Sequence, residues 1–104
     1  MNLIENPELA ERAAEVLKAV GHPLRLRLVA LLCKRPENVT QLARALGVPQ
    51  AIVSQHLRIL RMRGLVGVTR DSGHANYWLA EPHLRDMVWC VTGCVSGSQE
   101  GNDE

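Results

Sequence analysis

Two helical patterns separated by a glycine turn, and followed at once by β-prone residues, constrain the fold of this chain most. Thr40 is placed to cap a short helix over residues 41–46, and Gly47 ends it. A longer helix is predicted over residues 50–63, with apolar residues at helical spacing. Residues 65–79 then form two β-prone runs around an Asp-Ser-Gly turn, which predicts a β-hairpin. The sequence therefore predicts a helix-turn-helix followed by a wing.

Helical segments are also predicted on both sides of this unit. Asn6 and Pro7 suit a helix start, and the apolar spacing continues to a stop at Gly21. A second helix is predicted over residues 23–34, and a last one begins at Pro82. The expected fold is mainly α with a small β-hairpin, in the order of four helices, two strands and one helix. Leu, Val, Ile and Ala must build the core, because the chain has no Phe and only three aromatic residues.

The long helix of the helix-turn-helix is expected to turn one face inward. The apolar residues predicted to point to the core are Ile52, Val53, Leu57 and Leu60. Residues 1–95 are predicted to form one domain, which contains this helix-turn-helix. Residues 96–104 are rich in Gly, Ser and acids, and they are expected to form a disordered tail.

Charge is unevenly distributed along the chain. Residues 23–74 carry nine Lys or Arg against two acids, a net +7, whereas the whole chain has a net charge of +1. The two ends are acidic, so the positive charge lies where the helix-turn-helix and hairpin are predicted. This pattern indicates a polyanion-binding segment between two acidic ends.

Several broad classes of protein are disfavoured. No run of eighteen apolar residues is present, and the N-terminal residues lack the pattern of a signal peptide. Three cysteines are an odd number in such a chain, which favours thiols over a disulfide framework. The expectation is a cytoplasmic protein with no membrane partner.

The exposed side of the long helix has the residue types that read DNA. Gln can bond adenine through two hydrogen bonds, and Ser or His can bond base edges or phosphates. Arginines further along the helix and at the hairpin tip suit phosphates or the minor groove. The predicted DNA-binding residues are Gln50, Ser54, Gln55, His56, Arg58, Arg61, Arg70 and His74.

Two other functions are less consistent with the sequence than DNA binding. An enzyme is disfavoured because the sequence has no glycine-rich phosphate loop and no nucleophile elbow. A helix-turn-helix that contacts only proteins would more often expose apolar anchors than Gln, Ser, His and Arg.

The chain resembles the ArsR/SmtB family of metal- and thiol-responsive repressors over about residues 13–95. The resemblance is carried by the segments LKAVGHPLRLRLVALL, VTQLARALGVPQAIVSQHLRILRMRGLV and TRDSGHANYWL. It implies a homodimer built by the first and last helices, bound to double-stranded operator DNA with dyad symmetry. It also implies that an effector releases the DNA. The apolar stripes of the first and last helices agree with such an interface.

Three cysteines are the candidate effector residues: Cys33, Cys90 and Cys94. Cys90 and Cys94 lie four residues apart, on one face of the last predicted helix. Thiolates favour soft ions such as arsenite, zinc or cadmium, and accessible thiolates of lowered pKa can sense oxidants or persulfides. The predicted metal set adds Glu81 and His83 to these cysteines. No resident cofactor is expected.

The known branches of the family match these residues only in part. Glu81 and His83 occupy the first two positions of one metal site, Cys94 takes the third, and Gly97 takes the fourth, where it cannot bind a metal. A second branch pairs one cysteine in the second helix with one in the last, where this chain has Ser96 near the second position. The alternative is a repressor whose cysteines are structural and which has no metal or redox effector.

Overall fold

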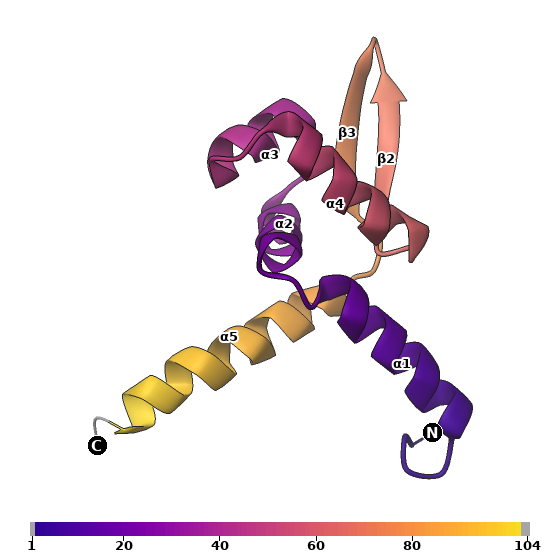
Figure 1. Ribbon diagram of the computed structural model, residues 1–104, viewed down its shortest axis with the longest axis vertical. Helices are drawn as coiled ribbons and strands as arrows, with labels where there is room; N and C mark the ends of the chain where they lie inside the picture. The colour runs from indigo at the N-terminus through magenta and orange to yellow at the C-terminus, as the bar shows by residue number, and fades with distance from the viewer. Residues whose placement is uncertain (1, 103–104) are drawn as a thin grey trace.

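The molecule is built around a central helix, with the helix-turn-helix and the hairpin on one side of it and two diverging helices on the other. The computed structural model describes residues 2–102, with side chains up to residue 96. Its helices are α1 (Pro7–Val20), α2 (Pro23–Lys34), α3 (Val39–Leu46), α4 (Gln50–Met62) and α5 (His83–Asn102). Its strands are β1 (Glu37–Asn38), β2 (Val66–Asp71) and β3 (His74–Leu79). Figure 1 shows α2 at the centre, with α1 and α5 pointing away from α3, α4 and the hairpin. This arrangement confirms the predicted winged helix-turn-helix.

Local sequence signals explain where most helices begin. The Asn6 side chain accepts a hydrogen bond from the Leu9 backbone N–H, at the start of α1. His22 performs the same role for α2, through its Nδ1 and the Leu24 N–H. The predicted Thr40 cap of α3 is wrong, because Asn38 caps this helix and forms a reciprocal capping box with Gln41.

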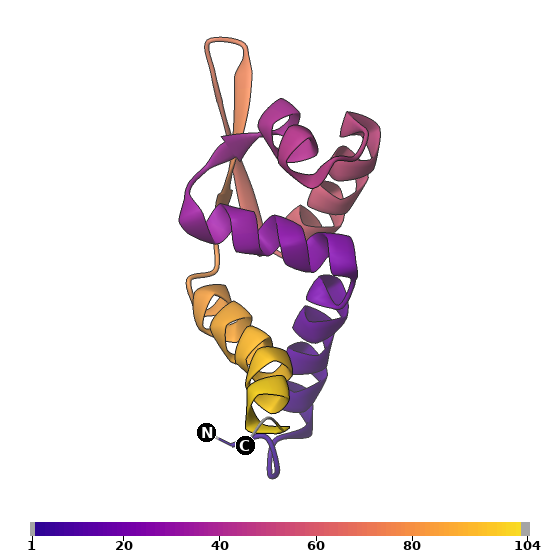
Figure 2. The ribbon, with the colours of Figure 1, turned by 90° about the vertical axis from the view of Figure 1, so that its left-hand side faces the viewer.

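The hairpin is joined by a third strand that the sequence did not predict. Strand β1 pairs with β3 in antiparallel fashion, which gives the sheet order β1-β3-β2. Only two residues long, β1 is too short to show an alternating pattern. Its pairing fixes the start of α3 to the base of the wing, beside the buried Tyr77 (Figure 2).

One core joins the helix-turn-helix to α2. The most deeply buried side chains come from α2, α3 and α4, and they are Leu28, Val29, Leu32, Leu42, Val53, Leu57 and Leu60. Ile52 was expected to face this core, but it is 38 % exposed on the flank of α4. Since Val53 occupies the inward position, its neighbour is turned by about 100° around the helix.

Helix α5 extends beyond the predicted end of the domain. It continues to Asn102, through most of the segment 96–104 that was expected to be disordered, and residues 103–104 lie outside the described residues. Helix propagation gains one backbone hydrogen bond per residue, so glycine lowers helix stability without setting an end. None of the described helices combines the length and apolar character needed to cross a membrane.

Candidate nucleic-acid interface

The turn between α3 and α4 sets the angle of the two helices. Gly47 adopts a left-handed conformation with φ of 69°, and its N–H donates to the Ala43 carbonyl at the end of α3. Pro49 then precedes α4. The Gln50 side chain donates to Thr40 Oγ1 at 3.3 Å, which connects the first turns of both helices. The N-terminal half of α4 is therefore held against α3.

Helix α4 presents a polar and cationic face to solvent. Val53, Leu57 and Leu60 anchor the helix, each with 0 % exposure. On the outer side, five of the predicted DNA-binding residues are exposed: Gln50, Ser54, Gln55, Arg58 and Arg61. The amides and hydroxyl lie toward the start of the helix, and the arginines lie further along. Short polar groups near the start of a groove-binding helix reach base edges, while cations further along reach phosphates.

His56 is the exception among the predicted contact residues of α4. It is half-buried, and its Nδ1 lies 3.1 Å from the Arg25 guanidinium of α2. Its ring also lies against His22, with 4.6 Å between ring centroids. Burial lowers the pKa of His56, as do the nearby His22 and Arg25. This side chain contacts the start of α2.

The residue after α4, together with the hairpin, completes the polar surface. Arg63 pairs with Glu15 of α1 at 2.9 Å. Arg70 and His74 are exposed on the two strands next to the turn, as predicted from the sequence, and the turn uses positive φ angles at Ser72 and Gly73. The hairpin therefore carries polar groups to the far end of the wing (Figure 1).

The wing is stiffened by one aromatic side chain that sequence analysis did not single out. Trp78 Nε1 donates to Thr69 Oγ1 across the strands at 2.9 Å. Its ring lies over Gly67, where a Cβ atom would come within 2.4 Å of a ring carbon. A side chain at position 67 would force the indole to shift, so this packing of Trp78 depends on Gly67.

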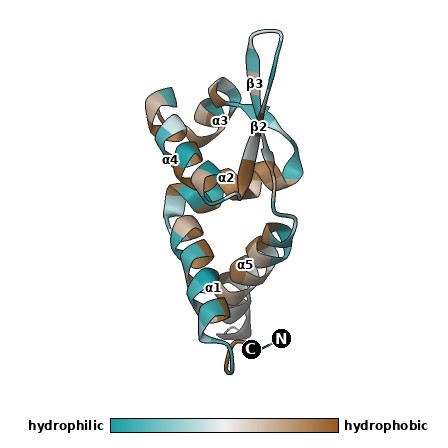
Figure 3. Ribbon diagram, turned by 90° about the vertical axis from the view of Figure 1, so that its right-hand side faces the viewer, coloured by the Kyte–Doolittle hydropathy of each residue, from teal (hydrophilic) through white to brown (hydrophobic). Residues whose placement is uncertain are grey.

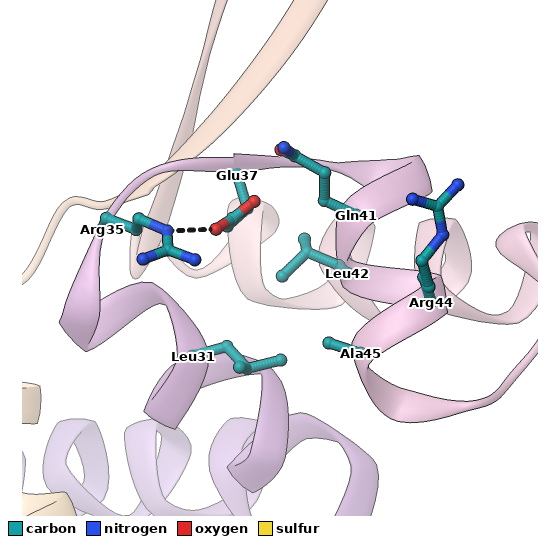
Figure 4. Close-up of a pocket in the computed structure, with 7 residues that line it drawn as sticks. All are labelled: Leu31, Arg35, Glu37, Gln41, Leu42, Arg44 and Ala45. Carbon is teal, nitrogen blue, oxygen red and sulfur yellow. Dashed lines mark hydrogen bonds and ion pairs between the residues drawn. The ribbon is translucent and has the colours of Figure 1, made fainter.

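A shallow pocket on the other side of α3 has a mixed lining (Figure 4). It measures about 250 Å³ and lies between α2, β1 and α3. Arg35 and Glu37 form an ion pair at 2.6 Å along its wall, and Arg44 stands at its edge. Its volume is below the ~300–1,000 Å³ typical of small-molecule sites.

The candidate effector residues are distributed between α2 and α5. Cys33 is half-buried in the last turn of α2, whereas Cys90 and Cys94 are exposed on α5. Arg85 of α5 donates to the Cys33 carbonyl at 3.3 Å. Burial raises the pKa of the Cys33 thiol, and the cation of Arg85 opposes part of this rise. Cys33 is therefore held in its protonated form more strongly than an exposed thiol.

The structure brings only part of the predicted metal set together. Glu81 and His83 meet at the start of α5, where the Glu81 carboxylate accepts from both the backbone N–H and the ring Nδ1 of His83. These hydrogen bonds lower the pKa of Glu81, and the carboxylate raises the pKa of His83. Among the side chains that the structure describes, residues 2–96, no three His, Cys, Asp or Glu gather closely enough to hold a metal ion. The contact between Glu81 and His83 thus stabilises the first turn of α5.

The outer faces of α1 and α5 differ in character from α4. Trp89 is 81 % exposed and Val95 is 61 % exposed on α5, and Leu17 is 58 % exposed on α1. Figure 3 shows hydrophobic residues along both helices, which lie on the side of the molecule away from the wing. Leu17 and Val95 belong to the apolar stripes expected from the sequence, whereas Trp89 was not part of the expected stripe.

The fold, the polar face of α4 and the wing define a winged helix-turn-helix regulator. The chain belongs to the ArsR family of bacterial regulatory proteins, whose family model matches residues 22–68. Family membership confirms the resemblance inferred from the sequence.

Individual relatives support the same assignment. The chain is 40% identical over 81 residues to the HTH-type transcriptional repressor SmtB of Mycobacterium tuberculosis, which covers 78% of this chain and 60% of that protein. It thus spans less than two thirds of that relative.

Solved structures extend the likeness over most of the chain. The transcriptional repressor BigR of Xylella fastidiosa aligns with a TM-score of 0.79 and 31% identity, over 88% of this chain and 93% of that one. The homodimeric winged helix-turn-helix DNA-binding domain of Mb0332 from Mycobacterium bovis aligns with a TM-score of 0.80 and 26% identity, over 89% and 86% of the two chains.

Sequence reasoning missed Arg25 and Trp78 as residues that organise the site. Arg25 belongs to the His-Pro-x-Arg segment that opens α2, but its partner His56 lies 31 residues away. No local spacing signals such a contact. For Trp78, the signal was present in the sequence, because a glycine and an aromatic residue at opposed positions of a hairpin often pack together.

Proposed function

We propose that this protein is a dimeric transcriptional repressor that binds double-stranded operator DNA in the cytoplasm. The observation that carries the proposal is the exposed polar and cationic face of α4, on a helix fixed by fully buried leucine and valine side chains. In the complex, α4 enters the major groove, with Gln55 and Ser54 directed at base edges. Arg58 and Arg61 neutralise phosphates.

The dimer places two such helices on one face of the DNA. In this proposal, α1 and α5 form the interface, because their outer faces expose Leu17, Trp89 and Val95. A two-fold axis through that interface would place the recognition helices about one DNA turn apart, ~34 Å. The wing, with Arg70 and His74, would then contact phosphates or the minor groove beside each half-site.

DNA binding is tested by fluorescence anisotropy of the reduced protein on the duplex upstream of its own gene. An unrelated duplex of the same length serves as the control. We expect binding to the upstream duplex to be at least about tenfold tighter, a free-energy difference of ~1.4 kcal/mol. Equal affinity for both duplexes would contradict sequence-specific repression.

We further propose that the α5 cysteines sense a thiophilic effector that releases the DNA. Cys90 and Cys94 are accessible on α5, which also exposes Trp89, Val91 and Val95. Soft metal or metalloid ions such as arsenite, zinc or cadmium, or an oxidant or persulfide, are the chemical classes that such thiols accept. Because the described residues of one chain assemble no three-ligand site, any further ligand for an ion would have to come from outside that set.

The effector is tested by adding arsenite, zinc and an organic persulfide separately to the preformed complex. We expect one of them to release the DNA, and Cys94→Ser to abolish that release. Cys33→Ser, in the half-buried position, is the matched control and should leave the response in place. If the DNA stays bound with every reagent, the cysteines are structural and the repressor has no effector of this kind.

A further inference from the structure

A polar cluster joins the recognition helix α4 to the junction between α1 and α2. Arg25, in the first turn of α2, is its centre. Its Nε donates to the carbonyl of Ala19 at 2.5 Å, in the last turn of α1, and its Nη1 lies 3.1 Å from His56 Nδ1 on α4. One guanidinium therefore contacts two helices besides its own.

The chemistry of this contact fixes the protonation state of His56. A guanidinium only donates hydrogen bonds, so His56 Nδ1 must accept, and the ring is then neutral with its proton on Nε2. His22 packs against the same ring at 4.6 Å, and its own Nδ1 accepts from the Leu24 N–H. A protonated His56 would lose its acceptor and would place a second cation beside Arg25.

We propose that Arg25 is a positioning residue for DNA reading, which holds α4 to the α1–α2 junction only while His56 is neutral. The inference rests on the proposed function, because it concerns how the helix that reads DNA is held. It gives α1, a helix of the proposed dimer interface, a direct polar connection to α4.

Surrounding groups favour the neutral ring in the folded protein. Burial is the main cause that lowers the pKa of His56, followed by His22 and Arg25. Among the described residues, His22 and Arg25 are the titratable or charged groups that lie against His56. Glu15 of α1 reaches α4 at Arg63 instead, at the far end of the helix. A lowered pKa means that the connection is intact near neutral pH and is lost as pH falls through that pKa.

The test compares the DNA affinity of wild type and Arg25→Ala at two pH values, by anisotropy on the upstream duplex. At about pH 8 we expect Arg25→Ala to bind roughly tenfold more weakly, as for loss of a hydrogen bond to a charged group. At an acidic pH, chosen below the lowered pKa of His56, we expect the two affinities to converge. The comparison cancels the protonation of other histidines, such as His74 on the wing, because both proteins carry them.

Two further variants distinguish a positioning role of Arg25 from an effect of its charge or of its contribution to folding. Arg27→Ala removes the same charge from the exposed side of α2. We expect the ratio of the wild-type affinity to the Arg27→Ala affinity to be the same at both pH values. In a His56→Asn background, whose amide oxygen can still accept from Arg25 but cannot titrate, the effect of Arg25→Ala should be the same at both pH values. Thermal unfolding at each pH verifies that every variant is folded. Should Arg25→Ala not fold, Arg25→Lys replaces it, because an ammonium lacks the planar fork that reaches both partners.

The inference would be overturned if the ratio of the wild-type affinity to the Arg25→Ala affinity were equal at both pH values. A ratio of wild type to Arg27→Ala that changed with pH would also overturn it. So would an effect of Arg25→Ala that still depended on pH in the His56→Asn background. Convergence for Arg25→Ala alone would support it. If the wild-type protein bound neither duplex at either pH, the proposed function would fail, and the inference with it.

Discussion

Helices α4 and α5 both pack against α2, but the surfaces that they expose to solvent differ in chemistry. Helix α4 buries Val53, Leu57 and Leu60 completely and exposes amides, a hydroxyl and arginines. Helix α5 buries Leu84 near its start and then exposes Trp89 and Val95. The outer face of α4 therefore suits a polyanion, whereas that of α5 suits another apolar protein surface. The difference indicates that the two helices serve different partners.

The largest effect is expected where α4 meets the core. Leu57→Ala removes a side chain with 0 % exposure and leaves a cavity, so it should lower the free energy of unfolding by about 2–5 kcal/mol. Ile59→Ala, on the same helix at 38 % exposure, should cost about 1 kcal/mol or less. Chemical denaturation measures both. Equal losses would mean that α4 is not anchored through its leucine face.

The next effect concerns the partner of α5. Trp89→Ala removes an exposed indole from the proposed dimer interface, and loss of such an aromatic anchor weakens association by about 2–4 kcal/mol. Sedimentation velocity should show a shift from dimer to monomer, with little change in the helical circular dichroism signal. Met62→Ala, at the 75 % exposed end of α4, is the control and should leave the dimer intact. A dimer that tolerates Trp89→Ala would remove this indole from the interface.

The same comparison explains what could be predicted from the sequence. Helix ends marked by local chemistry, such as Asn6-Pro7 and Gly47, were predicted correctly because the residues that decide them are neighbours in the chain. Most exposed residues of α4 followed from helical periodicity in the same way, except Ile52, which was expected to face the core. By contrast, β1 exists only because β3 lies beside it, and it carries no periodic pattern of its own.

Side-chain contacts between distant segments could not be predicted. His56 was expected on the DNA-facing side, and periodicity alone could not show that Arg25 and His22 lie against it. Likewise, Cys33 and the α5 cysteines were considered as one cluster, since α2 and α5 were expected to be close. The helices do pack together, but at Cys33 the hydrogen bond to α5 is made by the backbone carbonyl, with Arg85. Helix proximity is thus easier to infer than the direction of individual side chains.

The proposed base contact of α4 can be tested by its specificity. Gln55→Ala should weaken binding to the upstream duplex by about 1–3 kcal/mol, because a glutamine that reads a base forms two hydrogen bonds with it. Binding to the unrelated duplex should change much less. Anisotropy titrations on both duplexes at one salt concentration give the difference. Equal losses on the two duplexes would exclude Gln55 from base reading.

The smallest effect separates phosphate contacts from base contacts on the same helix. Arg61→Ala should reduce affinity for both duplexes alike and lower the slope of log affinity against log salt by about 1, because each phosphate contact releases close to one counterion. Arg12→Ala, an exposed arginine on α1, should leave the slope unchanged. If Arg61→Ala also leaves it unchanged, this end of α4 lies away from the DNA backbone. A reduced slope would instead show that the cationic part of α4 holds the helix in place while its start reads the sequence.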